Sequence, residues 1–558
     1  MRGLGDGDRE MQWRVLLAAL LSLLILLGYQ YLFAPTPRPT SSPPPKEEPV
    51  ASPPLLPQIP QPITPPVAAQ PSTPLIQAER EKEILLETDL LRVVVTNRGG
   101  AVKSWRLRAY EEAAGEPVEL VGSNGQSGPL PLAAWTADGE GQRGLYRIIE
   151  RPTAGGPQTV LLRFQGRSRL IIEKRLTLYP SRYLADLVVR VVNPGLAPIQ
   201  TDLRVQWGPG LRSGSRDVAA SLVAATAYVG GKRVQPTLKE PGQEHREKGS
   251  VEWAAVQDTY FAAALLSPEG SSESVLALDE RGRPIAGLLF SGLTIPAGGG
   301  REVPLGLYAG PKDLDRLGDI GRGLSALVNL GWFDFLARPA LWLLKFFYRF
   351  TGNYGIAIII ITILQKVAFY PLTRKSLESM RRMQALQPKI ATLKERYKNN
   401  PKKLNEETMA LYKREGANPL GGCLPMLVQI PIFIALYNAL SSSVELWRAP
   451  FVLWISDLSA PDTLFMIELY GSTVPVRVLP LIMGASMYIQ QKMTPTAGDP
   501  RQAQLMLYMM PVLFTFLFWG FPSGLVLYWL GNNLLQIGQQ HLMNRQQGVA
   551  AGAGQMAR

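Results

Sequence analysis

The sequence has little of the chemistry that most enzyme and metal sites need. Its 558 residues include one cysteine, Cys423, and two histidines, His245 and His541. An intramolecular disulfide is therefore impossible, and a Cys/His zinc site or a Cys–His nucleophilic pair is nearly excluded. No Gly-x-x-x-x-Gly-Lys-Ser/Thr loop occurs, so nothing indicates nucleotide hydrolysis. We expect no metal, no cofactor and no enzymatic activity.

Charged residues are also scarce, at 18% of the chain, whereas hydrophobic residues make up 46%. The apolar residues concentrate at the N-terminus and after about residue 330, which is typical of a membrane protein with a soluble insertion. The formal net charge of +13 is compatible with nucleic-acid binding. The basic excess lies beside the hydrophobic runs, however, and there it indicates membrane orientation instead.

The N-terminal region predicts a membrane anchor followed by a spacer. Val15–Phe33 is an apolar run of nearly spanning length, preceded by Arg9 and Arg14. A cleaved signal peptide ending at Ala34 is the alternative, but the run is long for one. We expect residues 1–34 to form an uncleaved signal anchor. Residues 35–79 form a proline-rich linker, with 16 prolines in positions 35–77.

Residues 80–310 have the pattern of a soluble all-β domain. Short runs rich in Val, Ile, Leu and Tyr alternate with clusters of Gly and Pro, which predicts an antiparallel β-sandwich. The clearest runs are Leu90–Thr96, Thr159–Phe164, Leu170–Leu178 and Leu184–Val192. No stretch in this region is long and apolar enough to span a bilayer. The composition predicts a domain that folds by itself, and carbohydrate binding by it remains open.

The C-terminal part predicts a helical membrane core. Residues 331–350 are apolar and aromatic but contain four charged residues, which favours a helix in the membrane interface over another span. Residues 351–542 form the core, and residues 543–558 a cytoplasmic tail. The predicted fold class is a multi-pass α-helical membrane protein with an all-β domain. The five predicted core spans are Gly355–Leu372, Gly421–Leu440, Arg477–Gln490, Leu505–Phe521 and Ser523–Leu542.

The segment between the first two core spans sets the orientation. Residues 373–420 contain 12 Lys or Arg and five Glu, and an apolar stripe from Met383 to Tyr397 recurs at spacings of three and four. This predicts a cytoplasmic helical hairpin. Loop 441–476 has one Arg and four acidic residues, so we expect it outside. Both chain ends are then cytoplasmic and domain 80–310 is external.

Polar side chains inside the predicted spans are the candidate functional residues. Lys366 lies within an apolar span, where a cation costs about 2.5–3.5 kcal/mol and normally faces protein or water. Snorkelling towards the cytoplasm is the alternative for Lys366, and helix–helix hydrogen bonds are the alternative for the amides. Polar groups on several helices together favour a shared wet groove. The candidates are Lys366, Thr362, Gln365, Gln429, Thr515, Trp519, Tyr528 and Asn532, and the last helix continues this stripe to Gln536.

Several motifs from Gly331 to Leu542 resemble those of the YidC-type membrane protein insertases. The N-terminal anchor and large β-domain resemble the form of bacteria with two membranes, with weaker likenesses at Thr96–Gly100 and Trp253–Phe261. The motifs are Gly352–Gly355, Pro371–Thr373, Ser379–Met380, Met383, Leu386–Lys389, Asn418–Pro425, Gln429–Phe433 and Phe521–Trp529.

The resemblance implies an insertase of the bacterial inner membrane that acts alone or with the Sec translocon. It implies a hydrophilic groove open to cytoplasm and lipid, with Lys366 at a position where the family commonly has Arg. The implied partners are nascent membrane-protein substrates and the lipid bilayer, the Sec translocon at a periplasmic β-domain, and the ribosome at hairpin 373–420. We expect a monomer. A small-molecule transporter is the main alternative, and a Ser–Lys protease using Lys366 and Ser523 is a weaker one.

Overall fold

A computed structural model describes residues 76–556 except for 113, 123–129, 154, 212–222, 269–271, 417–423, 470, 471 and 495–499. The predicted signal anchor 1–34 and nearly all of linker 35–79 lie outside the described residues. So do most of the Asn418–Pro425 motif with Cys423, and part of the predicted cytoplasmic loop 491–504.

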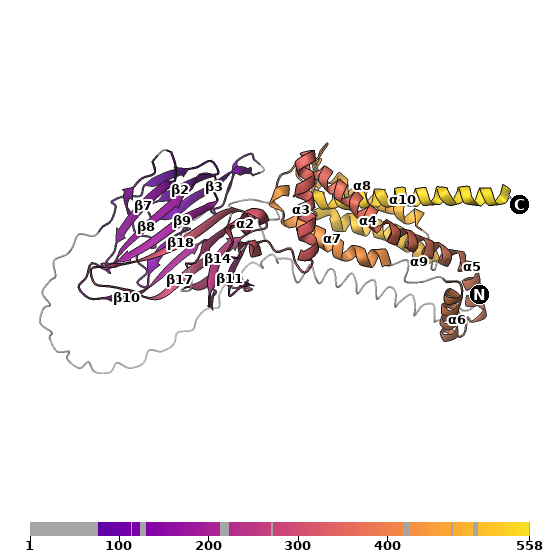
Figure 1. The fold of residues 1–558 in the computed structure, drawn as a ribbon, viewed down its shortest axis with the longest axis horizontal. Coiled ribbons are helices and arrows are strands. Elements are labelled where there is room, and N and C mark those ends of the chain that lie inside the picture. The colour runs from indigo at the N-terminus through magenta and orange to yellow at the C-terminus, as the bar shows by residue number, and fades with distance from the viewer. Residues whose placement is uncertain are drawn as a thin grey trace. The chain divides into compact units, whose positions relative to one another are not determined.

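The β-domain consists of antiparallel sheets (Figure 1). The nine-stranded sheet has the order β12 (Lys232–Val234), β11 (Ala224–Val229), β14 (Val251–Gln257), β15 (Phe261–Leu266), β18 (Gly300–Pro311), β9 (Leu184–Val192), β8 (Ile171–Leu178), β7 (Gln158–Gln165), β6 (Arg147–Glu150). The five-stranded sheet has the order β13 (Glu244–Lys248), β16 (Glu273–Leu278), β17 (Pro284–Ile295), β10 (Ile199–Trp207), β5 (Ala134–Thr136). The four-stranded sheet has the order β1 (Glu83–Glu87), β2 (Leu91–Thr96), β3 (Ala101–Glu111), β4 (Pro117–Glu119).

Alternation of side chains explains why these segments form strands. In β9, Ala185, Leu187, Val189 and Val191 are buried, and the residues between them are partly or fully exposed. This period of two is what a sheet with one covered face requires. The core includes the fully buried Trp105 and Trp207, whose rings meet edge to face at 5.9 Å.

One lysine also lies inside this sandwich. Lys174 in β8 is only 2% exposed, and its ammonium group donates to the carbonyl oxygens of Gly99, Gly100 and Leu132. The three donors of the ammonium group are therefore all used. Gly100 has a φ of +51°, a conformation that suits glycine, and a Cβ there would lie 3.3 Å from the Lys174 side chain. Burial lowers the pKa of Lys174 to about 7.

A short connecting segment, residues 312–333, joins the sandwich to the helical part. It contains α2 (Leu314–Ile320) and the 3-10 turn η2 (Leu324–Leu327). The helices that follow are α3 (Asp334–Thr351), α4 (Tyr354–Ala385), α5 (Gln387–Arg396), α6 (Pro401–Arg414), α7 (Leu424–Ser442), α8 (Val478–Met493), α9 (Pro500–Leu517) and α10 (Ser523–Met556). Between α7 and α8 lie η3 (Val444–Leu446) and the hairpin β19 (Phe465–Leu469) with β20 (Ser472–Val476), and η4 (Phe518–Gly520) follows α9.

The start of α4 depends on two residues of the Gly-Asn-Tyr-Gly motif. The Asn353 side chain accepts from the Ile356 amide at 3.2 Å and so caps the helix, while its amide donates to Phe451 O at 3.0 Å. A Cβ at Gly355 would lie 2.1 Å from the Phe451 ring. The motif therefore fixes the N-terminal end of α4 against the loop that follows α7.

Helix α4 is longer than the sequence predicts. The predicted span ends at Leu372, whereas α4 runs through Pro371 to Ala385 without a break. The Thr373 hydroxyl donates to Phe369 O at 3.0 Å, one turn back along the same helix. The span and the first part of the predicted hairpin are thus one continuous helix, and Pro388 lies in the first turn of α5.

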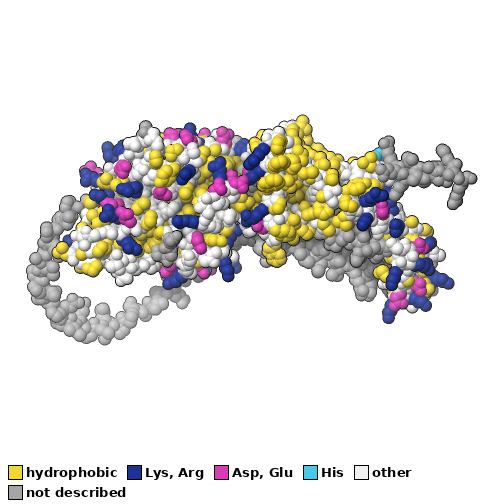
Figure 2. Space-filling view, viewed as in Figure 1, with side chains coloured by type: hydrophobic (Ala, Val, Ile, Leu, Met, Phe, Trp, Pro, Cys, Tyr) yellow, Lys and Arg dark blue, Asp and Glu magenta, His cyan; other side chains and the backbone are white. Residues whose placement is uncertain are grey.

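Among the described residues, Tyr354–Ala385 is the one helix with the length and composition to cross a membrane, and Val428–Ser442 and Gln504–Gly520 are shorter apolar helices. Figure 2 shows hydrophobic side chains gathered over the helical part, and charged ones over the sheets and the α5–α6 hairpin. Exposed apolar residues on α4 include Ile363, Leu364 and Val367. Such a surface is suited to lipid rather than to water.

Candidate functional site

A polar network links three helices of the apolar part, and Tyr528 of α10 is its centre. The Tyr528 hydroxyl donates to Gln365 Oε1 of α4 at 2.9 Å and accepts from Gln429 Nε2 of α7 at 3.2 Å. Tyr528 is 1% exposed, and both glutamines are half-buried. Three helices therefore each contribute one polar side chain to the same point, which on α10 lies among buried apolar residues such as Leu525 and Leu527.

Lys366 lies next to this centre, one residue after Gln365. Its ammonium group donates to Gln536 Oε1 of α10 at 2.9 Å, and the side chain is half-buried. Val367, the next residue, is 66% exposed. The cation therefore points towards α10 and the polar stripe Tyr528–Asn532–Gln536, and the exposed face of α4 is apolar.

Thr362 and Asn532 flank the same network. The Thr362 hydroxyl donates to Ile358 O of its own helix at 2.7 Å, so its hydrogen-bonding capacity is largely used within α4. Thr362 is 1% exposed and packs near Gly531, where an added Cβ would lie 3.7 Å from its methyl group. Asn532 is half-buried and lies one turn from Tyr528 along α10.

Two candidates from the sequence do not join the network. The Thr515 hydroxyl donates to Pro511 O of its own helix at 2.7 Å and packs so tightly on α8 that a Cβ at Gly484 would lie 1.9 Å from it. Trp519 lies in η4, where its carbonyl accepts from Arg477. The spacing of four residues predicted that Thr515 and Trp519 lie on one helix face. In the structure α9 packs on α8 at Thr515, and not on α4.

The sequence reasoning did not single out the polar contacts between α8 and α10. Asn533 Nδ2 donates to Ser486 Oγ at 3.1 Å, and Gln540 Nε2 donates to Thr494 Oγ1 at 2.9 Å. Asn533 and Gln540 are seven residues apart and thus on one helix face. This spacing in the sequence could have indicated a second polar face of α10. In the structure that face makes hydrogen bonds to α8.

Aromatic side chains pack beside the network. The rings of Phe433 and Phe518 lie 4.9 Å and 5.2 Å from that of Trp529, the residue after Tyr528. Phe518 is 2% exposed and also contacts Phe514 and Phe521. The buried aromatic residue of this segment is therefore Phe518, rather than its neighbour Trp519.

Comparison with known proteins identifies the family. The family model described as 60Kd inner membrane protein matches residues 346–549, and the one described as YidC periplasmic domain matches residues 83–343. The chain belongs to the YidC family. The matched ranges cover the helical core and the sandwich respectively, so the resemblance seen in the motifs is confirmed. The predicted fold class is confirmed with it.

Curated YidC proteins match this chain along almost its whole length. The Membrane protein insertase YidC of Syntrophus aciditrophicus is 38% identical over 96% of this chain and 100% of its own. That of Pelobacter propionicus is 40% identical over 96% of this chain and 99% of its own. A solved structure described as an active YidC insertase with the first transmembrane domain resolved is 21% identical, with a TM-score of 0.36, over 83% of this chain and 93% of that chain.

Proposed function

We propose that this chain inserts hydrophobic segments of other membrane proteins into the inner membrane, through a polar groove between α4, α7 and α10. The observation that supports the groove is the Gln365–Tyr528–Gln429 network with Lys366 beside it, on helices whose other faces are apolar. Buried polar groups and a cation at this depth normally serve a hydrated path. Thr362 and Asn532 belong to the proposed groove wall, and Thr515 and Trp519 stay predictions.

The mechanism needs no covalent step. A substrate's polar flank must cross an apolar layer, and a wet groove shortens the layer that it crosses. Lys366 offers a counter-charge to acidic residues in that flank. The apolar segment then moves between the helices into lipid, where burial contributes about 25 cal/mol per Å² of apolar surface. Catalysis in this sense is a lowered transfer barrier.

The described contacts weigh against the Ser–Lys protease. The Ser523 hydroxyl donates to Asp457 O at 2.5 Å at the start of α10, and its amide donates to Ala460 O at 2.8 Å. Lys366 bonds Gln536, which lies 13 residues further along the same helix. At about 1.5 Å per residue the two groups are therefore roughly 20 Å apart along α10.

The division of labour along the chain is also a proposal. Residues 1–34 would anchor the chain, 35–79 would link the anchor to the periplasmic domain 80–310, and 351–542 would insert substrates. We propose that hairpin 373–420 receives nascent membrane proteins or the ribosome, and that the β-domain contacts the Sec translocon. The basic hairpin and the acidic loop 441–476 support cytoplasmic termini. We propose a monomer in the bilayer.

The charge on Lys366 gives the direct test. Insertion is measured in liposomes for two matched substrates, one with an acidic translocated tail and one with the acids amidated. Lys366→Ala should slow the acidic substrate roughly 5- to 100-fold more than the amidated one, because one desolvated counter-charge contributes about 1–3 kcal/mol. Lys366→Arg should keep insertion of both, and Lys366→Glu should slow the acidic substrate further.

Lys492→Ala is the matched control, because it removes an exposed lysine at the end of α8, away from the network. It should leave both substrates unchanged. Equal loss of both substrates in Lys366→Ala would contradict the counter-charge and leave Lys366 as a topological anchor that snorkels. No insertion by the unsubstituted chain, in the presence or absence of the Sec translocon, would contradict the proposed function itself.

A further inference from the structure

Helix α3 covers the polar network from the side opposite the cytoplasmic hairpin. It contacts α4 and α7, beside which Figure 1 draws it, and its buried residues are Ala337, Leu341 and Leu344. Beneath them lies a narrow apolar cavity with Tyr528 at its edge. Ala439 of α7 lines the same cavity and is 1% exposed. Movement of α3 would therefore uncover the residues around the centre of the network.

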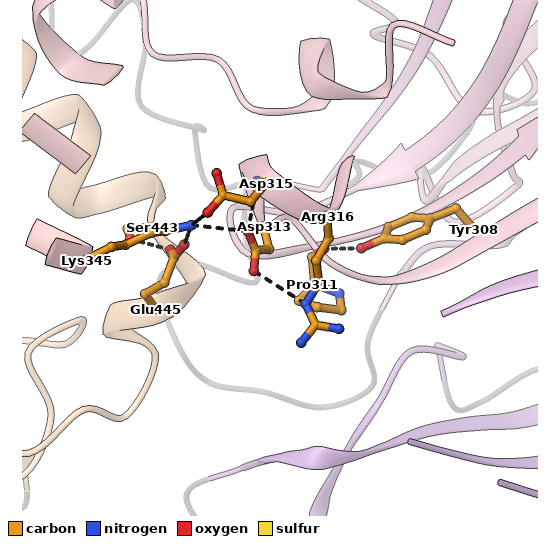
Figure 3. Close-up of polar contacts among 8 residues, drawn as sticks. All are labelled: Tyr308, Pro311, Asp313, Asp315, Arg316, Lys345, Ser443 and Glu445. Carbon is orange, nitrogen blue, oxygen red and sulfur yellow. Dashed lines mark hydrogen bonds and ion pairs between the residues drawn. The ribbon is translucent and has the colours of Figure 1, made fainter. Parts of the chain in front are cut away.

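One lysine of α3 makes ion pairs with three carboxylates outside the helix. Lys345 Nζ lies 2.5 Å from Glu445 Oε1, 2.8 Å from Asp315 Oδ2 and 3.2 Å from Asp313 Oδ1, as Figure 3 shows. The side chains of Lys345, Asp313 and Glu445 are 21%, 19% and 14% exposed, so the contacts with Asp313 and Glu445 are partly shielded from water, whereas Asp315 is 78% exposed. Burial by itself lowers the pKa of Lys345, but the carboxylates raise it well above its ordinary value, so the charge persists.

The three carboxylates come from two separate parts of the chain. Glu445 lies in η3, directly after α7, and is oriented by the Ser443 hydroxyl at 2.6 Å. Asp313 and Asp315 lie at the start of α2, where the Asp313 side chain accepts from the Asp315 amide. Figure 3 shows the side chains of Asp313 and Asp315 both directed towards Lys345, with Arg316 on the far side of Asp313.

The connecting segment that carries the two aspartates is hydrogen-bonded to the sandwich. Lys312 Nζ donates to Asp258 O at 2.9 Å, and the Lys312 amide donates to Tyr260 O at 2.7 Å. Further along, Arg322 donates to Ser267 O at 2.8 Å. A displacement of the β-domain would therefore move Asp313 and Asp315 away from Lys345.

The loop that carries Glu445 also contacts the sandwich. The Trp447 indole donates to Glu111 O at 3.0 Å, and its ring lies 5.0 Å from that of Tyr260 and 5.4 Å from that of Phe261. The sandwich thus contacts both parts of the chain that supply carboxylates to Lys345.

We propose that Lys345 is a positioning residue for insertion, which keeps α3 closed over the outer end of the groove, and that the β-domain controls this closure through Asp313 and Asp315. The proposal rests on the groove of the proposed function. Without the cation, three carboxylates would lie within a few ångströms of one another and would repel. Loss of Lys345, or withdrawal of the β-domain, then lets α3 move away from α7.

The test measures access to Ala439→Cys from outside, in a Cys423→Ser background, with a membrane-impermeant thiol reagent. The cysteine should be protected in the otherwise unchanged chain and should react about ten-fold faster with Lys345→Met, because a local closing interaction is lost. Lys345→Arg should restore protection. Arg338→Met is the matched control, since Arg338 is half exposed and its ion pair lies within α3, with Asp334 at 2.7 Å.

A second measurement uses the parent chain with Lys345 in place, so its result does not depend on whether a Lys345 variant folds correctly. Raising the external salt to about 1 M shortens the screening length to about 3 Å and weakens mainly the exposed contact with Asp315. Labelling of the parent chain should therefore rise, by less than with Lys345→Met, and labelling of Lys345→Met should not change. Equal labelling of all variants at both salt concentrations would overturn the proposal, as would equal opening by Arg338→Met. The Lys366 substrate pair is measured on the same preparations. If insertion depends on the charge at Lys366 but the labelling of Ala439→Cys is the same in all variants, the closure by α3 is wrong and the groove stands. If the parent chain inserts neither substrate, the proposed groove itself is wrong.

Discussion

At the scale of single residues, Lys174 shows how a buried charge depends on what surrounds it. Its ammonium group is satisfied by three backbone carbonyls inside the sandwich, and it lies 5.8 Å from the centre of the Tyr146 ring. Replacing it with an apolar residue would leave those carbonyls without their partner, which costs about 1–3 kcal/mol for a buried polar group.

The lowered pKa of Lys174 predicts a pH dependence of stability. Its pKa is about 7 in the folded chain against an ordinary value of 10.5, so between these values the unfolded chain binds more protons. The free energy of unfolding should then rise with pH from 7 towards 10.5, by up to about 1.4 kcal/mol per pH unit from this group. Below pH 7 both states are protonated and this contribution is flat.

Hydrogen exchange of the β8 amides in the detergent-solubilised chain measures this effect after correction for intrinsic exchange. The difference in pH slope between the parent and Lys174→Met isolates the group from other titrations. Lys103→Met is the control, because Lys103 is exposed on β3 and pairs with Glu83 at the surface. A parent and a Lys174→Met variant with the same slope would show that Lys174 stays charged when folded.

At the scale of elements, the α5–α6 hairpin has a very small core. The buried residues Met383, Leu386, Ile390 and Leu411 form it, with Met380, Leu393 and Tyr412 packed around them. The Asn400 side chain accepts from the Lys403 amide at 3.1 Å and so starts α6. The stripe from Met383 to Tyr397 was readable from the sequence because a helix repeats every 3.6 residues, and its partner Leu411 lies on the second helix.

The hairpin should therefore be sensitive to one substitution. Leu411→Ala should destabilise it by about 2–4 kcal/mol, since a fully packed leucine is removed from a core of few side chains. Limited proteolysis between residues 387 and 414 should become markedly faster. Met409→Ala on the same helix is the control, because Met409 is 58% exposed. Cleavage at the same rate in both variants would mean that the cluster does not stabilise the hairpin.

At the scale of the whole molecule, the charge asymmetry predicts the topology. Residues 80–310 and 441–476 should be external, and residues 373–420, 491–504 and 543–558 cytoplasmic. Single cysteines in the Cys423→Ser background test this at exposed positions: Lys232→Cys and Met466→Cys should react with an impermeant thiol reagent in spheroplasts, and Lys402→Cys should not. Reaction of Lys402→Cys before lysis would invert the scheme. Permeabilised cells, in which all three should react, are the control.

Contacts between the sandwich and the outer loop bear on how the β-domain behaves alone. The Tyr260 hydroxyl donates to Ser459 O at 3.4 Å, and Trp447 packs on Tyr260 and Phe261. An excised domain 80–310 would leave these aromatic residues without that cover. Its autonomous folding stays a prediction, supported by the many buried apolar side chains around Trp105, Trp207 and Trp253.

The sequence by itself determined the β-rich and helical parts and the polar stripe of the last helix, whereas the five spans stay predictions. Period-two and period-3.6 patterns are local properties of the chain, and so is the Lys/Arg asymmetry between loops. It also placed Lys366, Gln365, Gln429 and Tyr528 as candidates, because a polar side chain within an apolar span is conspicuous without any partner.

Only the tertiary structure decided which of these groups meet. Gln365 and Tyr528 are 163 residues apart, and Lys345 and Glu445 are about 100 apart, so no local pattern links them. Thr515 was a candidate by spacing, but the packing of α9 on Gly484 of α8 turned it away from the network. The identity of the facing helix is set by packing of surfaces from distant segments, and helical periodicity carries no information about it.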